Sequence, residues 1–406
     1  MENKKINKNI IVFVFYVIFV ISGILSVEVF RPIGGSILRV VRGQYDIEEA
    51  KSTIDSALTD ELTYHDQLIN INGLKENIIG NKVIRKSDAT IVKSETGSLM
   101  DVVEELDENE ISSVVKTIRN LKNISEDNGA RFLYCAAPKK ELFEKAPSNV
   151  NNYFQDNYED FLVTLTKKNV PYVDFSKTLI ESGISESDMF YYTDHHWKSY
   201  AGFVATNSIC EELNTKYSFH YNKQYTDINN YNISNYSDWF LGSKGKKAGK
   251  YFTWNGADDF DLIVPKFQTD MTEEQPFKNT IRKGSFEESV LYMENMEKDF
   301  YRVNTYATYS GGDFRLQIMK NNLNPKGEKV LLIRDSFACV VAPFLALQTS
   351  ELHICDVRDD EHYVGDKLNM EEYIEQIMNL CQYSGHLKCD FYAAQGAILW
   401  TASGVI

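Results

Sequence analysis

Apolar and polar residues alternate along most of the chain with periods that predict helices and short buried strands. Apolar positions recur at helical spacing in four segments, residues 111–128, 152–168, 199–213 and 337–348. Four short apolar segments have the length and composition of buried strands, residues 131–137, 170–175, 329–334 and 351–357. Because strand-like and helical segments follow one another, the pattern indicates βαβ units and an α/β fold with a mostly parallel sheet.

Two regions depart from this alternation. Residues 31–110 are polar and mixed, and we interpret the acidic run 101–110 as the solvated start of a helix. The region of about 215–325 has weak helical periodicity and is rich in Tyr, Asn, Asp, Phe and Gly. So long an interval inside an α/β domain is typical of a functional insertion. Its aromatic side chains suit stacking on sugar rings, or they simply pack the insertion.

The first thirty residues differ from the rest of the chain. Ile10–Val27 is an apolar run without a charge, and Lys4, Lys5 and Lys8 precede it. The run approaches the ~20 residues that a helix needs to cross a bilayer core, and the basic flank predicts a cytoplasmic N-terminus. It is longer than a signal-peptide core, and no A-x-A-like site follows it. We therefore expect an uncleaved signal anchor rather than a cleaved peptide or a buried helix. The protein would be a single-pass cell-membrane protein with the remainder exported, or a secreted one if the segment is cleaved.

Composition narrows the class of protein. The chain has 406 residues, 43% of them apolar and 25% charged, and a net charge of −15. Values this close to the globular average exclude a disordered chain, a collagen-like fibre and a multispan membrane protein. The acidic balance argues against nucleic acid as a partner, because phosphate binding needs clustered Lys and Arg. We expect an anchor at residues 1–30, a lead-in segment at 31–110 and one domain over 111–406 that contains the insertion.

The six cysteines do not form a recognisable motif. No C-x-x-C pair exists, so zinc-ribbon and thioredoxin signatures are missing from the sequence. Cys135, Cys339 and Cys355 lie inside apolar runs and resemble small buried hydrophobic residues. A disulfide between Cys381 and Cys389 stays open, but a chain of this length can bury a core without disulfides.

The first motif with chemistry is Tyr191–Trp197, which reads Tyr-Tyr-Thr-Asp-His-His-Trp and precedes a predicted helix. In a loop, Asp194 can accept a hydrogen bond from Nδ1 of His196, which fixes the tautomer and stabilises the imidazolium. Trp197 is expected to form a wall of the site. Two alternatives remain: Asp194, His195 and His196 as metal ligands, or a purely structural histidine pair. No H-E-x-x-H motif or spaced third ligand follows, so we predict no metal.

The second motif is Val330–Phe337, where an apolar strand is followed at once by Arg-Asp-Ser-Phe and a helix. Ser336 would stand at the carboxyl end of a parallel strand, where α/β proteins bind ligands. It would also stand at a helix N-terminus, whose free N–H groups could hold an oxyanion. A serine here can equally be a simple N-cap. Catalysis by Ser336 requires a base, and the chain offers one only if His196 lies close.

Together the two motifs resemble the DHHW proteins, which are SGNH-hydrolase-like relatives of the alginate O-acetyltransferases AlgJ and AlgX. The resemblance covers about residues 70–375. Four further segments carry it, namely the Pro-x-Lys at Ala137–Lys140, the Gly-Ser segment at Phe240–Gly245, the block Tyr309–Asp313, and the Asp-x-Arg at Asp356–Arg358. The segment 381–406 lacks the Pro-Asp and apolar strand with which the family pattern ends.

The resemblance implies a three-layer α/β/α fold in which the Asp-x-His element precedes the serine, the reverse of ordinary SGNH hydrolases. It implies a Ser336–His196–Asp194 triad, because His196 is the histidine that directly precedes the tryptophan. It also gives four candidates for substrate binding, namely Trp197, His195, Tyr309 and Arg358.

The implied activity is O-acetylation of a cell-surface or secreted polysaccharide through an acetyl-serine, without a cofactor. A multispan membrane acyltransferase would supply the acetyl donor, and the acidic charge suits a neutral glycan acceptor. Two alternatives remain. The same triad could act as an esterase or glycan deacetylase, or the protein could be a non-catalytic glycan-binding assembly protein. Arg334 supports the last alternative, because relatives often have Gly there and a bulky side chain could narrow the oxyanion hole.

Overall fold

The computed structural model of the chain describes residues 38–39, 42, 65–86, 89–127, 129–356 and 390–394. The predicted anchor at residues 10–27, Arg358, Cys381 and Cys389 lie outside these ranges, so what the sequence predicts for them stays a prediction. Within the described ranges, no helix combines the length and the apolar character needed to cross a bilayer.

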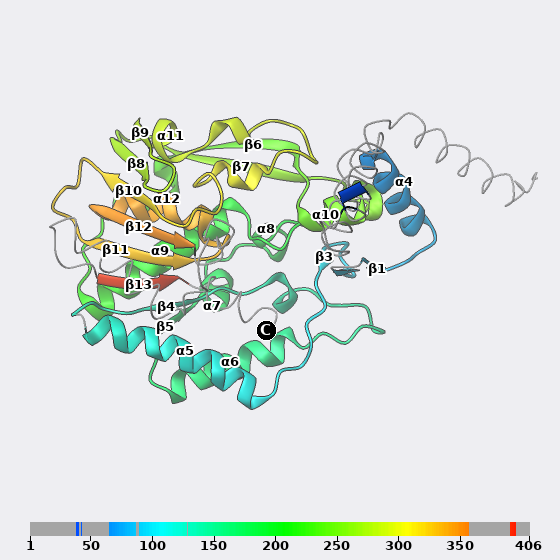
Figure 1. Cartoon of the computed structure of the whole chain (residues 1–406), viewed down its shortest axis with the longest axis horizontal. Coiled ribbons are helices and arrows are strands. Elements are labelled where there is room, and N and C mark those ends of the chain that lie inside the picture. Colours follow the sequence, from blue (N-terminus) through cyan, green and yellow to red (C-terminus); the bar gives the residue numbers. More distant parts are fainter. Residues whose placement is uncertain are drawn as a thin grey trace, which may run out of the picture.

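An eight-stranded sheet forms the centre of the main domain (Figure 1). Its strands lie in the order β5-β4-β13-β11-β12-β10-β8-β9. Their bounds are β4 Tyr134–Ala136, β5 Tyr172–Asp174, β8 Met271–Gln275, β9 Thr280–Gly284, β10 Gln317–Asn321, β11 Lys329–Arg334, β12 Glu351–Asp356 and β13 Asp390–Ala394. The four strands predicted from apolar runs are β4, β5, β11 and β12, and every pairing from β5 to β12 along the sheet is parallel.

The sheet is mixed, which corrects the expectation of a mostly parallel one. Strands β8, β9 and β10 come from the predicted insertion and extend the sheet beyond β12 through three antiparallel pairings. A short connection joins β8 to β9. Two strands joined in this way form a hairpin and must pair antiparallel. The weak helical periodicity of 215–325 therefore reflected strands and loops. The insertion also forms a separate antiparallel pair, β6 Tyr231–Phe240 with β7 Asp258–Pro265.

Helices cover both faces of the sheet, as the three-layer expectation requires. On β11, Val330 and Leu332 face one apolar core, whereas Leu331 and Ile333 face the other. This alternation follows from the two-residue period of a strand, and both faces are apolar because both are covered. The first core packs against α7 Phe175–Glu181, α9 Ser199–Tyr217 and α12 Ala338–Gln348, and the second against α5 Glu108–Asp127 and α6 Phe154–Lys167. Figure 1 shows α5 and α6 together on one side of the sheet.

Strand β13 corrects a second expectation, which was that the segment 381–406 lacks a strand. It lies between β11 and β4 in the middle of the sheet and pairs with both in parallel. Its sequence is Asp-Phe-Tyr-Ala-Ala, which is too short and mixed to be recognised as a central strand from its pattern alone. The C-terminal region therefore does supply a strand, although it lacks the family's Pro-Asp ending.

A small lobe lies beside the main domain and contains α4 His65–Ile78 and an antiparallel sheet β1-β2-β3 (Figure 1). The three strands span Val83–Arg85, Thr90–Lys93 and Leu99–Met100. Helix α10 Ser243–Ala248 and the turn η4 Lys250–Phe252, both from the insertion, complete it. The lead-in segment was not predicted to contain these elements.

Short helices and turns complete the described chain. They are α8 Glu186–Met189, α11 Phe286–Val290, η1 Lys140–Leu142, η2 Lys223–Thr226, η3 Ile228–Asn230, η5 Met293–Asn295 and η6 Thr305–Thr308. Two of them, η1 and η6, flank the site described next.

Candidate active site

Ser336 lies in the turn between the central parallel strand β11 and helix α12. The strand ends at Arg334 and the helix begins at Ala338, so the hydroxyl stands at the carboxyl end of the strand. The Asp335 carboxylate accepts the Phe337 N–H at 2.9 Å, and the Asp335 carbonyl accepts the Ala338 N–H at 3.2 Å. These bonds close the turn and leave the Ser336 side chain partly exposed.

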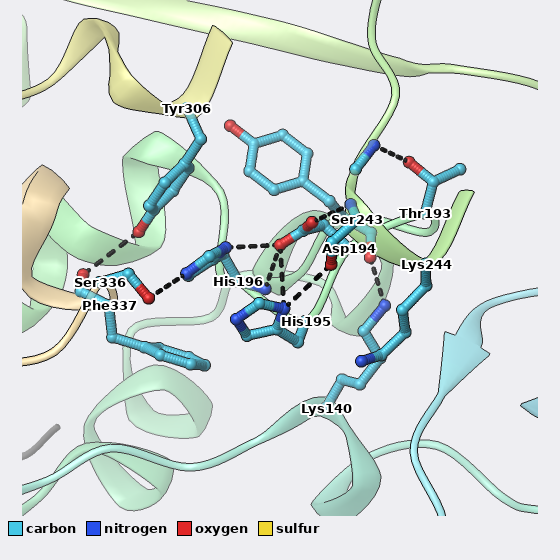
Figure 2. A network of polar contacts seen from close by, with 12 residues as sticks. Lys140, Thr193, Asp194, His195, His196, Ser243, Lys244, Tyr306, Ser336 and Phe337 are labelled. Carbon is cyan, nitrogen blue, oxygen red and sulfur yellow. Dashed lines mark hydrogen bonds and ion pairs between the residues drawn. The ribbon is translucent and has the colours of Figure 1, made fainter. Parts of the chain in front are cut away.

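His196 and Asp194 form an unbroken hydrogen-bonded line with Ser336 (Figure 2). Nε2 of His196 lies 2.7 Å from Oγ of Ser336, and Nδ1 lies 2.5 Å from Oδ1 of Asp194. Because the carboxylate holds the proton of Nδ1, Nε2 is left to accept a proton from the hydroxyl. The fold thus brings together the three residues that the sequence predicted, although 140 positions separate the histidine from the serine.

Burial and neighbouring charges set the ionisation of the acid. Burial opposes ionisation of Asp194, but the charges of His195 and His196 and the hydrogen bonds from His196 and Ser243 outweigh it. The pKa of Asp194 is therefore held well below its ordinary value. Burial, reinforced by the neighbouring His196, lowers the pKa of His195 well below its ordinary value. Asp194 is ionised near pH 7, so the carboxylate can stabilise a proton on His196.

Two buried charged side chains hold the backbone that leads into the motif. Nζ of Lys140, which is fully buried at the start of η1, donates to the carbonyl of Tyr191 (Figure 2). Asp258, the first residue of β7, accepts the N–H groups of Tyr192 at 2.6 Å and Thr193 at 2.9 Å. Burial lowers the pKa of Lys140 to about 8 and raises the pKa of Asp258. The Pro-x-Lys segment thus supports the loop that carries Asp194.

The Gly-Ser segment packs directly on the carboxylate. The Ser243 N–H donates to Oδ2 of Asp194 at 2.5 Å, and the Gly242 N–H donates to Oγ1 of Thr193 at 2.8 Å. A Cβ atom at Gly242 would lie 2.2 Å from Cβ of Asp194 and 2.5 Å from its Oδ2. Only glycine allows the two backbones to approach so closely. This explains why glycine stands at position 242.

A single backbone carbonyl links the base to the nucleophile turn. The carbonyl of Phe337 accepts the Trp197 Nε1–H at 2.9 Å and the Tyr306 hydroxyl at 3.2 Å. The ring of Tyr306 also stacks on His196, with 4.1 Å between the ring centroids and 16° between the planes. One side chain from η6 therefore contacts both the imidazole and the residue that follows Ser336.

Two of the predicted substrate contacts are structural supports instead. Trp197 is 1% exposed and donates to the Phe337 carbonyl, and Tyr309 is fully buried in the core. The Tyr309 hydroxyl accepts the N–H of Ile263 and donates to the carbonyl of Asp261. The family resemblance implied that both side chains face the substrate. The sequence around an aromatic residue does not show in which direction its side chain points.

His195 remains a candidate for substrate contact. Its side chain is 22% exposed, and its Nδ1 lies 3.4 Å from Oδ1 of Asp194 and 3.4 Å from Oγ of Ser243. In Figure 2 the other ring nitrogen points away from the carboxylate, on the side where the Phe337 ring lies. Arg358 lies outside the described residues.

Arg334 does not obstruct the turn that carries Ser336. Its guanidinium is buried, with Nη1 2.6 Å from Oδ1 of Asp313 and 3.5 Å from Oδ2 of Asp356, and Nη2 2.6 Å from the carbonyl of Gly312. Gly311 and Gly312 have φ values of +72° and +113°, a backbone conformation that glycine adopts without strain. The block Tyr309–Asp313 thus forms a loop that binds the arginine inside the protein.

Asp194, His195 and His196 are also the residues that the sequence offered as metal ligands. Asp194, His195 and His196 offer ligand atoms that lie within 4.8 Å of one another. However, both oxygens of Asp194 accept hydrogen bonds from protein N–H groups, and Nε2 of His196 faces Ser336. A metal would have to break these bonds. The arrangement favours the hydrogen-bonded line over a metal centre.

Two residues that support the candidate active site could not be predicted from the sequence. Tyr306 and Asp258 lie in the insertion, without a motif around them, and only their contacts with His196, the Phe337 carbonyl and the 192–193 backbone reveal their role. Lys140 and Gly242 lie in segments that the family resemblance had already singled out, although their structural tasks were not predicted.

The architecture and the serine at the β11–α12 turn define an SGNH-hydrolase-like α/β domain. Residues 98–231 match the family model of the SGNH hydrolase-like domain of acetyltransferase AlgX. The match includes the Asp-His-His-Trp stretch and ends before Ser336. It confirms the resemblance predicted from the sequence.

Solved structures share the fold. A DHHW family protein from Eubacterium siraeum is 15% identical, with a TM-score of 0.54 over 79% of this chain and 93% of that one. PatB1 of Bacillus cereus is 18% identical, with a TM-score of 0.55 over 79% and 96%. A PatB1 structure with a sulfonyl adduct is 19% identical, with a TM-score of 0.56 over 77% and 94%. No curated protein matches the sequence.

Proposed function

We propose that the protein is an O-acetyltransferase in which Ser336 is the nucleophile, His196 the general base and Asp194 the residue that orients and stabilises the base. The observation that carries the proposal is the hydrogen-bonded line of 2.7 and 2.5 Å through both nitrogens of His196. The match to an AlgX acetyltransferase domain supports acyl transfer as the reaction class.

The first half of the reaction forms an acetyl-serine. Nε2 of His196 takes the hydroxyl proton as Oγ of Ser336 attacks the acetyl carbonyl of the donor. Ser336 stands directly before α12, at the positive end of the helix dipole. This dipole would stabilise the oxyanion of the tetrahedral intermediate, while the N–H groups of Phe337 and Ala338 stay paired with Asp335. The intermediate collapses, and His196 returns the proton to the leaving group.

The second half transfers the acetyl group. A hydroxyl of the glycan acceptor gives its proton to Nε2 of His196 and attacks the acetyl carbon, and Ser336 leaves as the alkoxide and recovers the proton. Asp194 stays ionised in both halves, because its low pKa prevents it from taking the proton itself. The chemistry needs no cofactor.

The sequence adds the setting of this reaction. The predicted anchor at residues 10–27 would hold the domain outside the cytoplasm at the cell membrane. The acceptor would be a cell-surface or secreted polysaccharide, and a multispan membrane acyltransferase would bring the acetyl donor across the membrane. His195, partly exposed beside the base, is the side chain we assign to substrate contact.

Hydrolysis of a chromogenic acetyl ester by the purified full-length protein tests the triad. We expect turnover by wild type and by the surface control Ser187→Ala, and none by Ser336→Ala or His196→Ala. A sulfonyl fluoride should add one adduct to wild type and none to Ser336→Ala, measured by intact mass. Equal turnover in all four chains would refute the triad.

A second candidate reaction uses the same triad with water as the acceptor. It is favoured by the partial exposure of Ser336, because water can reach an acyl group on this hydroxyl. Acetylation of an oligosaccharide, followed by mass spectrometry alongside release of acetate, separates the two reactions. Transfer that exceeds hydrolysis supports the acetyltransferase, whereas acetate alone supports an esterase or glycan deacetylase. Glycan binding without any ester turnover would instead support a non-catalytic assembly protein.

A further inference from the structure

The small lobe has a charge opposite to that of the whole protein. It consists of residues 65–100 and 243–256, that is α4, β1–β3, α10, η4 and the residues that join them. These residues include nine Lys or Arg and four Asp or Glu, whereas the complete chain has a net charge of −15. Lys93 and Lys244 are buried, which leaves seven basic and four acidic residues. The lobe is therefore a basic pole on an acidic protein, and it would be attracted to an anionic surface.

The same lobe exposes large apolar side chains. Ile78 is 67% exposed, Ile79 61%, Tyr251 48% and Trp254 76%. Ile78 ends helix α4 and Ile79 follows it, and a hydrogen bond of 3.1 Å from Asn77 to the carbonyl of Tyr251 joins that end to η4. These four residues, which we call the apolar tip, thus come from two segments that are in contact.

The apolar tip does not serve the lobe's own core. That core is a small cluster of five buried residues, namely Ile84, Ile91, Leu99, Ala248 and Phe252. Large side chains left outside it are stable in water only at a cost, which is why exposed apolar groups rimmed by charges mark interaction sites. Trp and Tyr next to Lys are typical of side chains at a membrane–water interface.

We propose that the small lobe docks on an anionic lipid bilayer, with the apolar tip inserted among the lipid head groups and its lysines facing lipid phosphates. Aliphatic Ile78 and Ile79 at the tip favour lipid over a glycan, because sugar rings stack on aromatic faces and gain little from isoleucine. Lys247 on α10 and Lys82 after α4 are both exposed and supply cationic side chains to the lobe.

The position of the lobe in the chain fits this partner. Thirty-seven residues separate it from Val27, the end of the predicted anchor. A stretch of that length spans at most on the order of 120 Å, so the anchor by itself does not fix the distance between the domain and the bilayer. A docking surface on the small lobe would fix that distance.

Docking would also fix the active site relative to the membrane. The Leu99 N–H at the end of the lobe's sheet donates to the carbonyl of Tyr192 at 2.7 Å, two residues before Asp194. Lys244 of the lobe pairs with Asp101 of the main domain at 2.7 Å. The lobe is thus bound to the loop that carries the acid and the base. The proposal does not require acyl transfer, and a Ser336→Ala chain should dock equally well.

Quenching of tryptophan fluorescence by brominated lipids tests the contact directly. The full-length protein is mixed with or reconstituted into vesicles of phosphatidylcholine with one-third phosphatidylglycerol, with and without bromine on the acyl chains. Subtracting the signal of Trp254→Phe isolates the emission of Trp254 from that of the other three tryptophans. We expect that emission to be quenched by brominated lipid, and less so when phosphatidylglycerol is omitted.

Two further variants sharpen the test. Lys247→Glu removes one cation and adds one anion, so the docking equilibrium constant should fall roughly 25-fold if each charge contributes about fivefold. Ile79→Ser should reduce quenching, whereas Ile281→Ser on β9, with a matched exposure of 62%, should not. Trp254 that stays unquenched in all vesicles would overturn the proposal. A change in Trp254 emission that depends on added oligosaccharide or on protein concentration, and not on lipid, would also overturn it.

Discussion

Replacing Gly242 by alanine tests how closely the candidate acid must be held. The new Cβ would lie 2.2 Å from Cβ of Asp194, whereas ordinary van der Waals contact begins near 3.4 Å. Asp194, the Gly-Ser segment or both must therefore move by about 1.2 Å in total. The carboxylate is bound at 2.5 Å on each side, by His196 and by Ser243, so this displacement breaks at least one of the two bonds. A misplacement of this size in an active site reduces the rate on the order of 100-fold.

The assay is kcat for ester hydrolysis, measured beside the free energy of unfolding. Overpacking at Gly242 should also destabilise the fold by about 1–3 kcal/mol. Gly183→Ala is the control, because Gly183 has φ +75° with no heavy atom near its added Cβ; it should lose about 1 kcal/mol of stability and keep its rate. If Gly242→Ala keeps the wild-type kcat, the contact between Gly242 and Asp194 does not position the acid, and the reasoning fails.

Three further predictions concern the same site. Asp194→Asn should lower kcat by roughly 10⁴-fold, because an amide no longer fixes the His196 tautomer, and a rate within tenfold of wild type would refute that role. Tyr306→Phe removes the hydroxyl that donates to the Phe337 carbonyl but keeps the ring on His196, so it should cost about 1 kcal/mol of stability while Tyr306→Leu costs more. Burial lowers the pKa of Lys140 to about 8 from 10.5, so between these values the unfolded chain binds a proton that the folded chain has lost. The stability of wild type relative to Lys140→Met should therefore rise with pH across that window in denaturant titrations, and a flat difference would contradict the burial of a charged lysine.

Local pattern predicted those elements whose sequences carry their own signal. The helices at α5, α6, α9 and α12 and the strands β4, β5, β11 and β12 each bury a continuous apolar stripe or run, and the structure places them within a few residues of the prediction. The strands of the small lobe were missed because they are only two to four residues long. Strand β13 was missed because its sequence is mixed, and its place in the sheet depends on β11 and β4 on either side.

The sequence by itself determined the candidate chemistry. Asp194 and His196 are two residues apart, so one loop can join them, and the strand–Asp-Ser–helix pattern alone places Ser336 at a strand's carboxyl end. Only the tertiary structure decided what surrounds these groups. It turned Trp197 and Tyr309 inward as supports, because the direction of an aromatic side chain depends on the core it meets. It paired Arg334 with Asp313 inside the protein. It also placed Tyr306, Asp258 and Gly242 of the insertion against the loop that carries Asp194 and the turn that carries Ser336. Such contacts join residues far apart in the chain, and no local pattern encodes them.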